Sequence, residues 1–169
     1  LIPEEKNVRE EKSDAIAGLS STASLKEHFI NYGVEIRQEG NQLMVAGLRH
    51  RLAATLVIHL PEDINISVEV LTNNDIYVEG FRSEIEAINN FGDIVLKNII
   101  GPVVTENRNG NTLAIFTRIN QTSPYSLVAT NGDIVIRLPS AAEVTFTAQT
   151  PRGEFLTDFN FARIPKQNP

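Results

Sequence analysis

Cysteine and tryptophan are absent from this sequence, and basic residues are fewer than acidic ones. The lack of cysteine excludes disulfide bonds, thiolate catalysis and zinc sites built on cysteine. The 15 Lys and Arg residues against 21 Asp and Glu residues give a net charge of −6. Because binding to a phosphate backbone needs clustered positive charge, we do not expect nucleic acid as a partner.

Long apolar runs are also missing. No stretch approaches the roughly 18 apolar residues that a membrane-spanning helix needs, so we expect no insertion into a membrane. The first residues, 1–6, do not combine a basic segment with an apolar one, so they do not read as a signal peptide. The 169 residues, of which 41% are hydrophobic, are enough for one domain with a sizeable core.

What the sequence does contain is a repeated strand–turn–strand pattern. Its clearest copy covers residues 126–139, where two alternating apolar runs flank Asn131, Gly132 and Asp133. Asn and Gly tolerate positive φ and are typical of tight turns. We take the last turn residue of each copy as a marker. The marker positions are Asp75, Asp93, Asn111, Asp133 and Glu154, with spacings of 18, 18, 22 and 21 residues.

This near-constant period predicts an all-β solenoid. A unit of about 20 residues cannot bury its own apolar face, so neighbouring units must stack on one another. The residues expected to form the turns at the corners are Asn73, Asp75, Gly92, Asp93, Gly110, Asn131, Gly132, Asp133 and Gly153. The spacing across 111–133 leaves room for one extra loop at residues 120–124. A β-sandwich of hairpins is the alternative fold.

The residues before the repeats predict other elements. Ser24 followed by Glu27 is a capping-box pattern, and Gly33 suits the end of a helix, so a short helix is expected over residues 25–32. Alternating residues from 34 to 46 predict a β-hairpin, and residues 54–60 predict another strand. We therefore divide the chain into a lead-in with the helix, residues 1–33, and a repeat domain, residues 34–169.

At the repeats the sequence resembles a bacterial adhesin-like domain family of largely unknown function. The family signature is Val-x-Thr-x-Asn-Gly-Asp-Ile-x-Val, which residues 128–136 match almost throughout and residues 71–78 match with Asn in place of Gly. The Leu138-Pro139 pair also has a counterpart, and the resemblance covers residues 34–161. It implies a β-solenoid, usually a right-handed β-helix, that is exported or attached to the cell envelope.

The acidic column Asp75, Asp93, Asp133 and Glu154 is the most tempting metal site, because stacked carboxylates suit Ca²⁺. Asn111 interrupts this column, and the glycines of calcium-binding repeats are missing. We therefore expect the column to cap turns and expect no metal and no cofactor.

Catalytic signatures are weak. The histidines His28, His50 and His59 match no metal-binding spacing, and no Gly-x-Ser-x-Gly nucleophile motif is present. Residues 49–51 form a small basic turn that could contact an anionic glycan. We therefore expect no enzyme activity, and a polysaccharide-active enzyme is the alternative that fold analogy suggests.

The C-terminal part is rich in phenylalanine, at Phe146, Phe155, Phe159 and Phe161. A solenoid must cover its last coil or stack on another molecule, so these rings are expected to cap the core or to form a homo-oligomer contact. The function we expect is a non-enzymatic interaction module of the cell envelope, with a protein or glycan ligand. A cytoplasmic regulatory or assembly domain is a further alternative.

Overall fold

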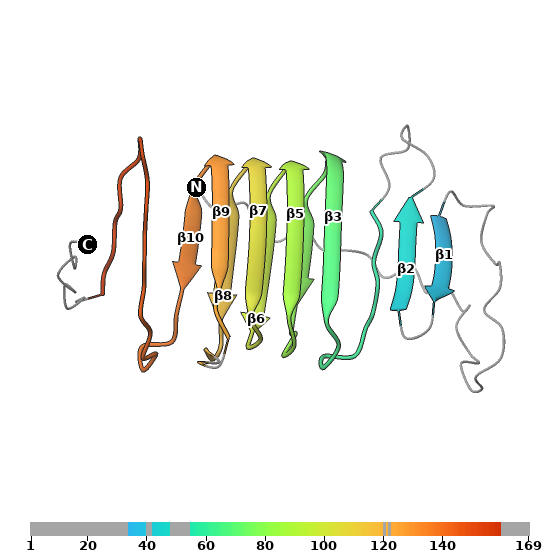
Figure 1. The fold of residues 1–169 in the computed structure, drawn as a ribbon, viewed down its shortest axis with the longest axis horizontal. Coiled ribbons are helices and arrows are strands. Elements are labelled where there is room, and N and C mark those ends of the chain that lie inside the picture. The colour runs from blue at the N-terminus through green and yellow to red at the C-terminus, as the bar shows by residue number, and fades with distance from the viewer. Residues whose placement is uncertain (1–33, 40–41, 48–54, 120, 122, 160–169) are drawn as a thin grey trace, which may run out of the picture. The chain divides into compact units, whose positions relative to one another are not determined.

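The computed structural model describes residues 34–39, 42–47, 55–119, 121 and 123–159. The chain divides into two compact units, Leu1–Val57 and Ile58–Pro169. In the first unit the described strands β1 (Val34–Glu39) and β2 (Gln42–Gly47) form an antiparallel hairpin, as the alternating pattern predicts (Figure 1). The helix expected over 25–32 and the basic turn at 49–51 lie outside the described residues.

The second unit is a β-solenoid of four coils, each made of two strands (Figure 1). The first coil contains β3 (Ile66–Asn73) and β4 (Ile76–Glu79), and the second contains β5 (Ile85–Phe91) and β6 (Ile94–Ile99). The third contains β7 (Val103–Asn109) and β8 (Thr112–Phe116), and the fourth contains β9 (Ser126–Asn131) and β10 (Ile134–Arg137).

Two parallel sheets run the length of the solenoid, in the orders β3-β5-β7-β9 and β4-β6-β8-β10. All strand pairs within the two sheets are parallel. A meander of hairpins would pair neighbouring strands antiparallel, so the solenoid prediction is confirmed and the sandwich of hairpins is excluded. No helix occurs among the described residues, and so none that could span a membrane is found there.

The strand register confirms the repeat alignment. Ile76, Ile94, Thr112 and Ile134 each follow a marker residue, and they pair with one another in that order across the sheet. The longer third spacing is accommodated between β8 and β9, where the extra loop was expected.

The core lies between the two sheets. Along each strand of the second and third coils, buried and more exposed residues alternate, because successive side chains point to opposite faces of a strand. Ile85, Ile94, Leu96, Ile99 and Val103 are fully buried. The edges of the core are closed by partly buried residues: Ile66, Val68, Val70, Phe81, Ile119, Tyr125, Leu127, Ile136 and Leu138.

Two sequence-based expectations differ from the structure. Residues 55–60 of the expected strand 54–60 contain no strand, and the fifth repeat around Glu154 contains none either. The solenoid therefore has four paired coils rather than five. Phe146 and Phe155 stack on each other, with ring centroids 5.7 Å apart, and neither is among the residues packed against the core. Phe161 lies outside the described residues.

Candidate binding face

The marker side chains connect successive coils at the corner between the two sheets. The Asp93 N–H donates to Asp75 Oδ1 at 2.8 Å, and the Asn111 N–H donates to Asp93 Oδ1 at 2.7 Å. The Asp133 N–H continues the series by donating to Asn111 Oδ1 at 3.0 Å. Each marker side chain therefore accepts the backbone N–H of the marker in the next coil, and an amide oxygen at position 111 does the same as a carboxylate.

Backbone carbonyls and two buried asparagines complete this corner. Marker carbonyls also accept N–H groups of the preceding coil. The Ile76 N–H donates to the Asp93 carbonyl at 2.9 Å, and the Thr112 N–H donates to the Asp133 carbonyl at 2.8 Å. Asn89 Nδ2 donates to the Asn74 carbonyl at 3.0 Å, and Asn107 Nδ2 donates to the Gly92 carbonyl at 3.1 Å. Both asparagines are fully buried, and their side-chain amides donate hydrogen bonds to corner carbonyls that are not paired within the strand ladders.

Of the residues in the weak alternative metal site, the Asp75 and Asp93 side chains thus accept backbone N–H groups. Within the described residues, no group of three or more His, Cys, Asp or Glu side chains is close enough to hold a metal ion. Glu154 and Gly153 are not part of the column, because they lie beyond β10. His59 is exposed and lies outside any strand.

The outer face of the β4-β6-β8-β10 sheet carries a row of apolar side chains. Tyr77, Val95, Leu113 and Val135 occupy equivalent positions on the four strands, and the register places them side by side. We call these four residues the apolar row. Tyr77 and Val135 are 56% and 45% exposed, and the two central members are half-buried. Neighbouring strands are about 4.8 Å apart, so the row crosses the sheet as one continuous strip.

Charged residues border the apolar row at the next outward position along the strands. Glu79 pairs with Lys97 between β4 and β6, and Arg137 lies at the corresponding place on β10. The apolar residue Ile115 of β8, which pairs with Arg137, interrupts this charged border. Lys97 Nζ lies 5.3 Å from the centre of the Tyr77 ring, within the range of a cation–π interaction. The Tyr77 hydroxyl donates to Glu79 Oε2 at 2.7 Å. This hydrogen bond, with some burial and the negative charge of Glu79, raises the pKa of Tyr77 to about 12.

The outer face of the β3-β5-β7-β9 sheet is different. Its first row is Ser67, Glu86, Val104 and Ser126, and its second row is Glu69, Ile88, Glu106 and Val128. Ser67 Oγ donates to Glu86 Oε2 at 2.8 Å, and Arg108 forms an ion pair with Glu106 at 3.3 Å. The first row has a single apolar member, Val104, and in the second row acidic and apolar side chains alternate, so neither row forms a continuous apolar strip.

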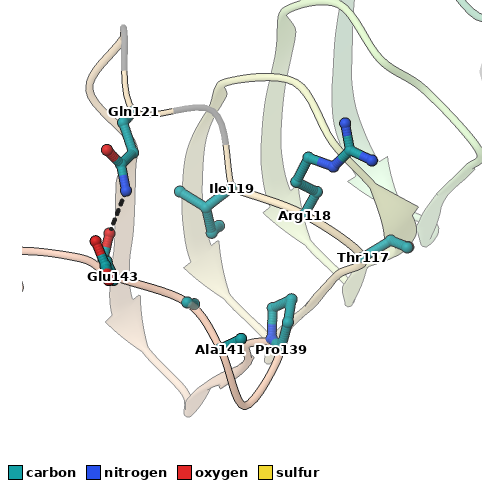
Figure 2. A pocket seen from close by; sticks show the side chains of 8 residues that line it. Thr117, Arg118, Ile119, Gln121, Pro139, Ala141 and Glu143 are labelled. Atoms are coloured by element: carbon teal, nitrogen blue, oxygen red, sulfur yellow. Dashed lines mark hydrogen bonds between the residues drawn. The ribbon is translucent and has the colours of Figure 1, made fainter.

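A shallow pocket of about 340 Å³ lies between the β8–β9 loop and the connector after β10 (Figure 2). Its lining includes Arg118, Ile119, Pro139 and Glu143, and Gln121 Nε2 donates to the Glu143 carbonyl at 2.9 Å. Hydrolysis of a glycosidic bond ordinarily uses two carboxylates. Glu143 is the one carboxylate among the residues that line this pocket.

The apolar row was missed from the sequence, although a signal for it exists. Each of its members stands two residues after a marker, and so recurs with the repeat. Outward apolar residues of a strand look like any others in a single copy, so the row becomes visible only when the copies are aligned. Comparisons of the chain with protein-family models, curated proteins and solved structures gave no match. The class of protein, a β-solenoid repeat protein, therefore rests on the strand register itself.

Proposed function

We propose that this chain is a non-enzymatic binding module that recognises a protein ligand through the apolar row. The observation that carries the proposal is the alignment of Tyr77, Val95, Leu113 and Val135 across four paired strands. Apolar cores bordered by charged residues are the usual anatomy of a protein–protein contact. Lys97, Glu79 and Arg137 provide that border here and would give the contact its orientation.

A protein ligand is favoured over a glycan by the chemistry of the row. Three of its four members are aliphatic, and Tyr77 is its single aromatic residue. An aliphatic strip gains binding energy when its apolar surface is removed from water. An apolar surface on another protein can cover the strip more completely than a hydroxylated sugar can. A glycan ligand remains the second choice for the same surface.

Two valines of the fourth coil provide a matched test. Val135 belongs to the apolar row and is 45% exposed, whereas Val128 faces outward from the other sheet and is 50% exposed. Binders would be selected on the native domain from a displayed peptide library and from a glycan array. We expect Val135→Asp to weaken most selected peptides by at least about tenfold, and Val128→Asp to leave them unchanged. Equal effects of the two substitutions would contradict the proposal.

The absence of catalysis is part of this proposal and has its own test. Native protein would be incubated with a panel of neutral and acidic polysaccharides, and the release of reducing ends would be measured over time. We expect no release above that of a heat-denatured sample. Release that Glu143→Gln abolishes would instead support a polysaccharide-active enzyme at the pocket beside β10.

We also propose that the module works outside the bacterial cytoplasm, at the cell envelope. The support is the resemblance of residues 34–161 to the adhesin-like domain family. The genomic coding sequence upstream of Leu1 tests this directly. An export signal there is expected, and a cytoplasmic protein of other function fused directly to this chain would contradict it.

A further inference from the structure

Within the described residues, the solenoid ends at its C-terminal side in unpaired strand edges. β9 and β10 are the last strands of their sheets, and no described strand pairs with their outer edges. Ile134 is 38% exposed, whereas Ile94 and Ile76, at the equivalent positions, are 0% and 4% exposed. An unpaired sheet edge with apolar residues beside it is a surface that another strand can extend.

We propose that residues 144–158 of this same chain cover this end of the solenoid as a fifth coil, with Gly153 at its corner. Residues 144–158 are described, but they contain no strand. The segment has bends at residues 151–153, and Figure 1 shows it running in one direction, turning, and returning beyond β10. This is the path that each of the four paired coils follows.

The glycine pattern of the corners gives the first reason. A Cβ added to Gly110 would lie 2.0 Å from the Gly92 carbonyl oxygen, and one added to Gly132 would lie 2.0 Å from the Gly110 carbonyl oxygen. Any coil stacked on a preceding corner must therefore have glycine just before its marker. A coil stacked on β9 and β10 would place that residue over the Gly132 carbonyl. Gly153, directly before Glu154, is the residue that the 21-residue spacing puts there.

The same rule argues against a second copy of the chain as the occupant. Head-to-tail stacking would bring the first coil of another copy onto β9 and β10. The residue before the marker of that coil is Asn74. If it stacked as Gly110 and Gly132 do, its Cβ would clash with the Gly132 carbonyl oxygen, as a Cβ at Gly110 or Gly132 would clash at 2.0 Å with the carbonyl beneath it. Among the described residues, the one non-glycine residue with positive φ is Asn98, so Asn74 lacks the backbone conformation of Gly110 and Gly132. Gly153 does not have positive φ in this structure either, but glycine can adopt it without steric cost, whereas asparagine carries a Cβ.

The marker hydrogen bonds give a second reason. Asp75, Asp93 and Asn111 each accept the N–H of the next marker. No such bond to the Asp133 side chain is found within the described residues, because β9 and β10 end the two sheets there. A fifth coil would bring the Glu154 N–H to Asp133 Oδ1, which continues the column by one step.

The side chains of the segment fit this register. Aligning Glu154 with Asp133 places Ala148 and Thr150 over Leu127 and Ala129, and Phe155 over Ile134. It also places Phe146 over Tyr125, which packs edge-to-face on Phe116 with centroids 5.4 Å apart. On the outer face, Leu156 would adjoin Val135. Leu156 is 84% exposed in the structure, and in this register it would extend the apolar row by one residue.

Engineered disulfides test the register, because the chain has no cysteine of its own. The outward positions Val128 and Gln149 would be neighbours on adjacent strands, with Cα atoms about 4.8 Å apart, which a disulfide can bridge. Thr147 would lie two residues out of register with Val128, about 8 Å away and beyond bridging distance. The experiment compares the variants Val128→Cys/Gln149→Cys and Val128→Cys/Thr147→Cys in a glutathione redox buffer.

We expect Val128→Cys/Gln149→Cys to form an intramolecular disulfide at least about tenfold faster than the out-of-register pair. Equal rates would mean that the segment samples the edge without register, and would overturn the proposal. Disulfide-linked dimers in place of monomers would show that a second copy is the occupant, and would overturn it as well.

A third variant keeps the result independent of cysteine reactivity. Gly153→Val in the Val128→Cys/Gln149→Cys background should lower the rate to that of the out-of-register pair. Ser140→Ala, an exposed change before the segment, is the control and should leave the rate unchanged. Because Gly153 lies outside the four paired coils, circular dichroism should show an intact β-solenoid in every variant. Fast crosslinking in the presence of Gly153→Val would contradict the role assigned to this glycine.

Discussion

The third and fourth coils are built from the same repeat, yet the better copy of the motif is the less buried one. Residues 130–134 match the repeated signature fully, and Ile134 within them is 38% exposed. In the third coil Asn111 and Thr112 replace the Asp and Ile of the signature, and Thr112 is fully buried. Thr112 has a paired coil on both sides, whereas Ile134 belongs to the last paired coil. Between these two residues burial follows the neighbouring coils, and not how well each coil preserves the motif.

The interior of the third coil shows how much this stacking tolerates. Thr105, Asn107 and Thr112 are buried side by side with Val103 and Ala114. Asn107 Nδ2 donates to two corner carbonyls, but Asn107 Oδ1 and the two threonine hydroxyl oxygens have no hydrogen bond within the described residues. Unpaired buried oxygens destabilise a fold. The third coil carries them between two neighbouring coils that pair with it on both sides.

The largest effect should come from a corner glycine between two coils. Gly110→Ala would place a Cβ 2.0 Å from a backbone carbonyl, at a φ of +144°. The clash and the backbone strain together should lower the free energy of unfolding by about 3–5 kcal/mol, measured by urea denaturation. Gly80→Ala is the matched control, since Gly80 has a φ of +81° with nothing within 4 Å. Gly80→Ala should lower the free energy of unfolding by about 1–2 kcal/mol, through the strained backbone conformation alone.

If the two glycine substitutions cost the same, backbone contact between coils is not what fixes glycine at the corners. The requirement for Gly153 in a fifth coil would then lose its basis.

The next effect compares equivalent isoleucines of the second and fourth coils. Ile94→Ala should cost about 2–5 kcal/mol, because this side chain is 0% exposed and its removal leaves a cavity. Ile134→Ala should cost less if only four coils are paired, since 38% of this residue is exposed. With the fifth coil in place Phe155 would cover Ile134, and the cost should rise toward that of Ile94→Ala.

A double-mutant cycle separates these cases. We expect Ile134→Ala to cost more in the native chain than in a Gly153→Val background, and Ile94→Ala to cost the same in both. Denaturant midpoints and slopes for the six proteins provide the measurement. An Ile134→Ala cost that is independent of Gly153 would speak against the fifth coil.

Much of the fold could be predicted because the repeated turns use residues, above all glycine, that the backbone conformation of a corner requires. Gly92, Gly110 and Gly132 marked the corners, and alternation of apolar residues marked the strands, so the register of Ile76, Ile94, Thr112 and Ile134 followed from counting. The same spacing predicted a strand pair around Glu154, which is unpaired in the structure. Pairing depends on contacts across coils, which residue spacing alone does not determine.

The proposed binding face was missed, although counting two residues on from each marker would have found it. Tyr77 and Val135 are ordinary strand residues in any single copy, and what distinguishes them is that they lie in one row with Val95 and Leu113 across the sheet. Asn89 and Asn107 were likewise missed, because a buried asparagine in a strand has no signature apart from the corner carbonyls it meets. Turn residues carry local constraints, whereas surfaces and buried amides are defined by contacts between coils.

The smallest effect concerns the acidic column itself. Asp93 Oδ1 accepts the Asn111 N–H at 2.7 Å, and Asn111 Oδ1 does the same for Asp133, so an amide oxygen already serves in this place. Asp93→Asn should therefore change the free energy of unfolding by less than about 0.5 kcal/mol, whereas Asp93→Ala should lower it by about 1–3 kcal/mol. Thermal unfolding with and without millimolar Ca²⁺ completes the test. If the column acts only as a set of acceptors, calcium leaves the midpoint unchanged in all three proteins. A rise of several degrees that is lost in Asp93→Asn would mean that the carboxylates bind the cation, and that the charge at position 93 has a role which its hydrogen bond does not explain.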